Sequence, residues 1–165
     1  MSHQQMLKHS LVVDIKSQTM NYYRQEKLVR EFRVSTAKNG PGQMFGSQCT
    51  PLGLHILRAK IGATLPINAV LVKRRWTGEV YSSKLKETYP YRDWILTRII
   101  WLSGCEVGFN RLKNVDSMRR FIYIHGTPDT EPMGRANSHG CIRMRNNEII
   151  ELFDSVPLYT KLLIQ

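Results

Sequence analysis

Residues 135–148, RANSHGCIRMRNNE, bring a histidine, a glycine and a cysteine together in a segment rich in arginine. A cysteine acts as a nucleophile when a nearby base takes its proton, and backbone amides can stabilise the oxyanion that forms on the attacked carbonyl. His125 and His139 are the two candidate bases for Cys141, and Gly140 would let backbone amides approach a substrate. These residues predict nucleophilic catalysis by a thiol.

Two other interpretations of the same residues stay open at this point. His125, His139 and Cys141 could be three ligands of a catalytic zinc ion, which needs only three from the protein. Against zinc, the sequence lacks an H-x-E motif paired with P-C-x-x-C. Cys141 could also be an ordinary buried cysteine beside unrelated histidines, since cysteine is among the most buried residue types.

A short helix is predicted directly after this loop. Ile149, Ile150 and Phe153 have helical spacing, Asn146 or Asn147 is the expected N-cap, and Glu148 falls in the first turn. The positive end of the helix, together with nearby arginines, is expected to favour the thiolate of the cysteine over the thiol.

The rest of the chain predicts a mainly β protein with little helix. Alternating or β-branched runs indicate strands over 11–15, 20–23, 28–34, 54–61, 94–102, 119–126 and 159–164. Residues 35–53 carry four glycines and two prolines and are predicted to form a long loop. Residues 63–91 are polar and are expected to be irregular.

His125 is expected near the end of the strand predicted over 119–126. Tyr123 and His125 fall on one face of it with Phe121, whereas Ile122 and Ile124 fall on the other. The Gly- and Pro-containing excursion over 126–140 can then fold back and bring Cys141 to the end of this strand.

Composition indicates one globular domain over residues 1–165. The apolar share is 42% and the charged share is 22%, values typical of soluble proteins. Cys49, Cys105 and Cys141 form no paired spacing, so reduced thiols are expected. No apolar run is long enough for a signal-peptide core or a membrane span, which predicts a cytoplasmic protein without membrane contact. A removed leader would instead imply the periplasm.

The net charge is +11, from 24 Lys and Arg against 13 Asp and Glu. Such a charge attracts anions in general, whether nucleic acids or small carboxylates. The basic residues are dispersed and no nucleic-acid-binding module surrounds them, so a solvated basic surface is expected and nucleic acid is not a predicted partner.

The sequence resembles the L,D-transpeptidase catalytic domain, also called YkuD. That family's signature is a histidine followed by Gly-Thr and then, after a gap, Ser-x-Gly-Cys-Ile-Arg with a nearby Asn; here it reads IHGTPDTEPMGRANSHGCIRMRNNEI. Upstream, CTPLG at 49–53 is similar to the family's Thr-Pro-x-Gly turn, and residues 11–40 are similar to its amino-terminal strands. The resemblance covers nearly the whole chain and implies an open β-sandwich or barrel with a short helix after the cysteine loop.

The resemblance assigns roles to residues of the loop. It implies that Cys141 is the nucleophile, that His125 is its general base, and that the Gly126 carbonyl orients the imidazole. Ser138, His139 and Gly140 would shape the loop, with the Gly140 and Cys141 amides forming much of the oxyanion hole.

Two of the remaining positions are less specific in the family. The position of His139 varies among relatives, so it is taken as a neighbour of the site and not as the base. Arg143 matches the family's arginine, which implies either binding of a substrate carboxylate or a structural role in holding the loop.

The implied substrate is a murein stem tetrapeptide or muropeptide, and no metal or organic cofactor is implied. Family members cleave the bond between the L-centre of the diamino acid at position three and the terminal D-Ala, leaving a thioester on cysteine. Capture of the thioester by water would make the enzyme an L,D-carboxypeptidase of cell-wall recycling, which the absence of a leader in the sequence favours. Capture by an amine would make it an L,D-transpeptidase that forms crosslinks or exchanges D-amino acids. A noncatalytic binder of wall fragments or nucleic acid is a more distant alternative.

Overall fold

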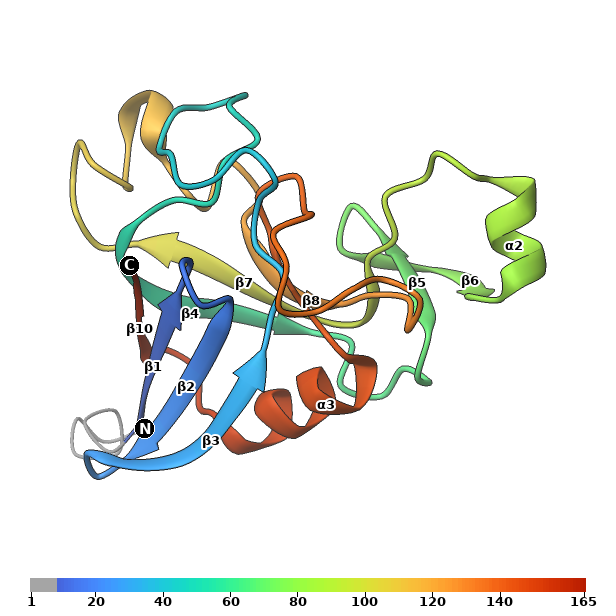
Figure 1. The fold of residues 1–165 in the computed structure, drawn as a ribbon, viewed down its shortest axis with the longest axis horizontal. Helices are drawn as coiled ribbons and strands as arrows, with labels where there is room; N and C mark the ends of the chain where they lie inside the picture. The colour runs from blue at the N-terminus through green and yellow to red at the C-terminus, as the bar shows by residue number, and fades with distance from the viewer. Residues whose placement is uncertain (1–8) are drawn as a thin grey trace.

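The structure is a computed structural model, and it describes residues 9–165 (Figure 1). The protein is mainly β, as the sequence predicted. Its strands are β1 (His9–Asp14), β2 (Thr19–Arg24), β3 (Lys27–Arg33), β4 (Gly53–Ile61), β5 (Ala69–Val72), β6 (Arg75–Val80), β7 (Leu96–Gly104), β8 (Tyr123–Gly126), β9 (Ile142–Met144) and β10 (Lys161–Ile164). Its α-helices are α2 (Ser83–Thr88) and α3 (Asn146–Ser155), and Lys113–Val115 form a 3₁₀ turn. None of the helices in this part of the chain is long and apolar enough to cross a membrane.

The strands form one open sheet in the order β3-β2-β1-β10-β4-β7-β5-β6, with β8 joined to β7 and β9 joined to β8. Two pairs are parallel, namely β1 with β10 and β8 with β9. Strand β8 carries His125, and β9 begins directly after Cys141, so the pairing of β8 with β9 brings the two ends of the histidine-to-cysteine segment together.

Alternating burial explains the amino-terminal strands. Leu11 and Val13 of β1 are buried opposite Tyr22 and Met20 of β2, their antiparallel partners. Side chains two apart point to the same face of a strand, so these four residues pack into the main core while their neighbours face outward. The alternation of buried and less buried side chains along both strands agrees with the strands predicted from the sequence.

Strand β7 is largely buried and pairs with β8, the strand that carries His125. Residues 96–100 are all buried, because β4, β5 and β8 pair with this strand and α3 packs against it. Helix α3 buries Ile149, Leu152 and Phe153 in the main core. The β-branched and aromatic run predicted as a strand over 94–102 therefore corresponds to a largely buried strand that begins and ends two residues later.

Two predictions about the elements were wrong in part. Residues 63–91 are not irregular throughout, because they form the β5–β6 hairpin and α2, which Figure 1 shows to one side of the main sheet. The apolar stretch of β5 is only four residues long, and α2 buries no residue. Periodicity is therefore too weak in this region to reveal the elements.

The start of α3 also differs from the prediction. Arg145 is the N-cap and makes no side-chain cap hydrogen bond, whereas Asn146 is the first helical residue. The Asn146 side chain instead accepts a hydrogen bond from Thr97 and donates to Asn68 and to the Thr127 carbonyl. These tertiary contacts outweigh the local preference of asparagine for the capping position.

Candidate active site

Strands β8 and β9 place the predicted catalytic residues on one face. Their parallel register pairs Ile124 with Ile142 and His125 with Arg143. Register partners in a sheet point to the same face, and residues two apart on one strand do so too. His125 and Arg143 therefore face the same way, while the two isoleucines enter the core. Cys141, which directly precedes β9, packs against the cluster that contains Tyr123, and Tyr123 lies two residues before His125 on the same face of β8.

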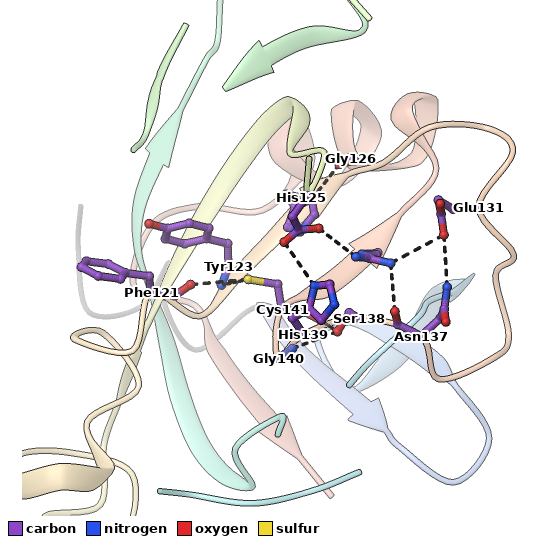
Figure 2. A network of polar contacts seen from close by, with 12 residues as sticks. Phe121, Tyr123, His125, Gly126, Glu131, Asn137, Ser138, His139, Gly140 and Cys141 are labelled. Carbon is purple, nitrogen blue, oxygen red and sulfur yellow. Dashed lines mark hydrogen bonds and ion pairs between the residues drawn. The ribbon is translucent and has the colours of Figure 1, made fainter. Parts of the chain in front are cut away.

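The thiol of Cys141 is held by the backbone at the start of β8. Its Sγ–H donates to the carbonyl of Phe121, and its sulfur accepts from the amide of Tyr123, both at 3.4 Å (Figure 2). Burial raises the pKa of Cys141 to about 12, although the Tyr123 amide acts in the opposite direction. In the resting protein this residue is therefore a neutral thiol.

This result corrects the expectation of a preformed thiolate. Arg143 does lower the pKa of Cys141, as the prediction supposed, and Arg120 adds to this effect. Burial is nevertheless the largest influence, and the carboxylate of Asp93 also raises the pKa. Activation of the thiol therefore requires a base that removes the proton during the attack.

His125 has the properties of such a base. It is buried, with 1% of its surface exposed, and its Nδ1 lies 2.6 Å from the carbonyl oxygen of Gly126. Burial lowers the pKa of His125 more than the Gly126 carbonyl and Asp93 raise it. The ring is therefore neutral near pH 7, and because the carbonyl can only accept, Nδ1 carries the hydrogen and Nε2 is free to take a proton.

Gly126 is needed at its position because nothing larger fits. A Cβ atom there would overlap the Asn146 side-chain oxygen and would lie 2.6 Å from the carbonyl oxygen of Leu96. The strand that carries His125 is thereby packed directly against β7 and the first residue of α3. This close approach fixes the carbonyl that bonds the imidazole.

The cysteine loop is held by two hydroxyl groups. Ser138, which is buried, donates from Oγ to the carbonyl of Cys141 at 2.5 Å and accepts from the amide of Gly140 at 3.2 Å. Thr50 donates from Oγ1 to the carbonyl of Gly140 at 2.9 Å. Gly140 has a φ of +131°, a conformation that other residues rarely adopt. The Gly140 amide is therefore engaged by Ser138, which leaves the Cys141 amide as the other predicted oxyanion donor.

A charged network borders the site (Figure 2). Arg143 donates from Nη2 to Oδ1 of Asp93 at 2.9 Å and from Nη1 to the carbonyl of Asn137 at 3.1 Å. Its Nη1 also lies 3.6 Å from Oε2 of Glu131, and Nδ1 of His139 lies 3.6 Å from Oδ2 of Asp93. Only 8% of the Arg143 side chain is exposed. These contacts are those that a loop-holding arginine would make, while binding of a substrate carboxylate by Arg143 stays a prediction.

Two depressions in the surface meet at His139. The first, of about 310 Å³, lies beside the charged network and is lined among others by Lys38, Arg92, Asp93 and Asn137. The second, of about 210 Å³, lies on the side of Phe121 and Arg120. His139, whose side chain is 61% exposed, lines both.

The zinc interpretation finds no support in the geometry. Within residues 9–165 no group of three or more His, Cys, Asp or Glu side chains is arranged to hold a metal ion. His125 and His139 are engaged by the Gly126 carbonyl and by Asp93 instead. The three cysteines are free thiols.

Three residues of this site were missed as site residues in the sequence. Asp93 lies in the stretch between α2 and β7, where no pattern pointed to chemistry. Thr50 is part of the CTPLG turn, and that turn was a signal that could have suggested a contact with the loop. Asn146 was taken for a helix cap, although it joins β7, β8 and the start of β5.

Comparison with known proteins supports the resemblance. The L,D-transpeptidase catalytic domain family, YkuD, matches residues 8–164. YqjB of Bacillus subtilis is 43% identical over 58 residues, which are 35% of this chain and 31% of that protein. YkuD of the same species is 49% identical over 41 residues, 25% of each chain. These matched segments span about a quarter to a third of those relatives.

Solved structures of the family share the fold. Bd1075 of Bdellovibrio bacteriovorus superposes with a TM-score of 0.61 at 17% identity, over 96% of this chain and 48% of its own. LdtMt1, solved in complex with imipenem, superposes with a TM-score of 0.58 at 16% identity, over 96% of this chain and 59% of its own. The chain thus spans about half of these larger proteins. Because the family model matches residues 8–164 and the fold is shared, this chain belongs to the L,D-transpeptidase catalytic domain family.

Proposed function

We propose that the protein cleaves the L,D bond between the position-three diamino acid and the terminal D-Ala of a murein stem tetrapeptide. The observation that supports this proposal is the pairing of β8 with β9, which brings His125 and Cys141 to the same face of the sheet. The carbonyl of Gly126 holds the His125 imidazole in place there. A neutral thiol beside a neutral imidazole is the arrangement needed for general-base activation of a nucleophile.

The first chemical step is acylation of the thiol. Nε2 of His125 takes the proton from Sγ of Cys141 as the sulfur attacks the carbonyl carbon of the L-centre. The negative charge that develops on the carbonyl oxygen is stabilised by the Cys141 amide. Collapse of the tetrahedral intermediate breaks the C–N bond, His125 returns the proton to the departing D-Ala amine, and a tripeptide thioester remains on the enzyme.

The tetrapeptide would bind in the first depression. Lys38 and Arg92 bring positive charge to its lining, which suits a substrate that carries several carboxylates. Arg143 offers little exposed surface for such a contact. We therefore propose that the two more accessible cations meet the substrate and that Arg143 holds the loop.

For the second step we propose that water captures the thioester, which releases the tripeptide and restores the thiol. Arg120 supports this outcome, because it lines the second depression and places a positive charge where an acceptor would approach. A cation there disfavours an incoming ammonium group. The protein would then act as an L,D-carboxypeptidase.

Transfer to an amine is the second candidate, and the second depression itself favours it. A cavity on the far side of the cysteine loop could seat the amine of another stem peptide. The same thioester would then give a crosslink or an exchanged D-amino acid, as in an L,D-transpeptidase.

Product analysis separates the two outcomes. Purified protein is incubated with murein tetrapeptide, with and without an excess of a second D-amino acid, and the products are identified by mass spectrometry. Tripeptide and D-Ala in both reactions would establish the carboxypeptidase. Exchanged tetrapeptide or dimers in excess over tripeptide would establish the transpeptidase, and an intact substrate would contradict both.

A further inference from the structure

Asp93 is placed by firmly packed neighbours, although it lies in a connecting segment. Arg92 donates to Glu79 at 2.8 Å, and its guanidinium lies 4.1 Å from the ring of Tyr89. Trp94 is buried and packs edge-on against Tyr81, with the ring centroids 5.0 Å apart. These contacts fix the backbone on both sides of Asp93, so its carboxylate has a defined direction.

That carboxylate is directed at two side chains in and beside the cysteine loop, Arg143 and His139. One oxygen accepts from Arg143 at 2.9 Å, and the other lies 3.6 Å from Nδ1 of His139. The Asp93 side chain is 46% exposed, so the contact is formed at the rim of the first depression and not in the core. A segment distant in sequence therefore supplies the negative charge that borders the cysteine loop.

We propose that Asp93 is a positioning residue for the reaction at Cys141: its carboxylate holds Arg143 and His139 in place and is the negative charge that faces the His125 imidazole. The inference deepens the proposed function and rests on it. Asp93 itself touches neither the thiol nor the attacked carbonyl in this scheme. It acts through Arg143 and His139, which it contacts, and through the effect of its charge on His125.

Few charged groups act on His125 and Cys141. The charges that act on His125 are Asp93, from the segment before β7, and Arg143, from β9. Cys141 is influenced by the same two residues and by Arg120. Burial is the largest cause for both groups, lowering the pKa of His125 and raising that of Cys141, and Asp93 raises both pKa values.

Removing the charge of Asp93 should lower the pKa of both His125 and Cys141. Asp93→Asn keeps the size of the side chain and an oxygen that can accept from Arg143, but removes the negative charge. Both pKa values then fall, so the thiolate forms at lower pH and the imidazole stays neutral to lower pH. The whole pH dependence of the site should move toward acid.

Glu131→Gln is the matched control. Glu131 also faces Arg143, at 3.6 Å, yet it is not among the groups that shift the pKa of His125 or Cys141. This control removes one carboxylate from the same arginine without removing the charge that faces the imidazole. Asp93→Glu, which keeps the charge on a longer arm, completes the series.

The experiment measures the rate of alkylation of Cys141 by iodoacetamide against pH, with peptide mapping by mass spectrometry to separate Cys141 from Cys49 and Cys105. We expect Asp93→Asn to react faster than wild type by a factor of about three to ten at about pH 8. Its whole profile should be displaced to lower pH, while Asp93→Glu and Glu131→Gln should follow the wild-type profile.

Two results would overturn the inference. One is an Asp93→Asn profile that coincides with wild type, and the other is an equal displacement in Asp93→Asn and Glu131→Gln, which would mean a general effect on Arg143. Thermal unfolding of each variant shows whether it is folded. Alkylation needs no substrate, so it tests Asp93 alone, whereas release of D-Ala by a Cys141→Ala variant would overturn the proposed function.

Discussion

Nδ1 of His125 donates a hydrogen bond to the backbone carbonyl of Gly126 over 2.6 Å, and this contact determines which ring nitrogen can act as a base. Backbone carbonyls do not titrate, so the contact holds the same tautomer over a wide pH range. The second nitrogen, Nε2, is then available for the proton of Cys141. The chemistry of the site depends on this pair being rigid, which the packing around Gly126 ensures.

Removal of the base should cost more than removal of its neighbour. We expect His125→Ala to lower the rate of D-Ala release by about 10² to 10⁴, the usual contribution of a general base. His139→Ala should lose much less, because His139 is largely exposed and, among the charged side chains of residues 9–165, forms an ion-pair contact with Asp93 alone. Steady-state kinetics with murein tetrapeptide compares the two. Equal losses would mean that both histidines, or neither, serve as the base.

Ser138 should be important for the shape of the cysteine loop. Ser138→Ala removes the hydrogen bond to the Cys141 carbonyl and leaves the Gly140 amide without its partner. We expect a loss of about 1 to 3 kcal/mol in the free energy of unfolding, the cost of an unsatisfied buried polar group. Urea denaturation measures it. Ser138→Thr keeps the hydroxyl and should recover most of the stability, and a failure to do so would show that the volume at this position matters more than the hydrogen bonds.

The sequence predicted the strands of the main core better than those of the site, because β9 was not predicted and the strand that carries His125 begins at Tyr123 and not at residue 119. The alternation in β1 and β2 and the apolar run of β7 come from burial in the main core, which one-dimensional patterns record well. Asp93 could not be found in this way, because its role depends on the β5–β6 hairpin and α2 bringing a distant residue to the loop. The raised pKa of Cys141 could not be predicted from the sequence either, because burial of the thiol is a property of the folded chain.

The two interpretations of Arg143 predict different responses to the substrate. If Arg143 holds the loop, Arg143→Ala should lower kcat/KM by the same factor for a tetrapeptide and for its analogue with an amidated side-chain carboxylate. If it binds that carboxylate, amidation should weaken the wild type and leave the variant unaffected, as in a double-mutant cycle. We expect the first result, because the guanidinium is occupied by Asp93, Glu131 and the Asn137 carbonyl.

A buried histidine away from the site should make the fold sensitive to acid. His55 is fully buried, with Nε2 at 2.8 Å from Oγ of Ser117 and Nδ1 at 3.0 Å from the carbonyl of Gly53. Burial lowers its pKa from 6.5 to about 4. In the unfolded chain His55 takes a proton below its ordinary pKa, whereas in the folded protein it does not, so stability falls as the pH drops from about 6.5 to about 4. The loss amounts to about 3 kcal/mol.

Urea denaturation at several pH values tests this expectation. His55→Gln can donate to the Gly53 carbonyl and accept from Ser117 without titrating. It should therefore show a shallower dependence of the free energy of unfolding on pH over that interval. His125 is also buried with a lowered pKa, so part of the slope should remain. The same slope in wild type and His55→Gln would mean that His55 is not the source.

Trapping the acyl-enzyme is the most direct test of whether Cys141 is the nucleophile. The protein is mixed with murein tetrapeptide, quenched in acid within the first turnover, and analysed by intact-protein and peptide-level mass spectrometry. We expect an added mass of the tripeptide acyl group on the peptide that contains Cys141, absent from Cys141→Ala and strongly reduced in His125→Ala. Release of D-Ala without any adduct at Cys141, or an adduct on another residue, would contradict it.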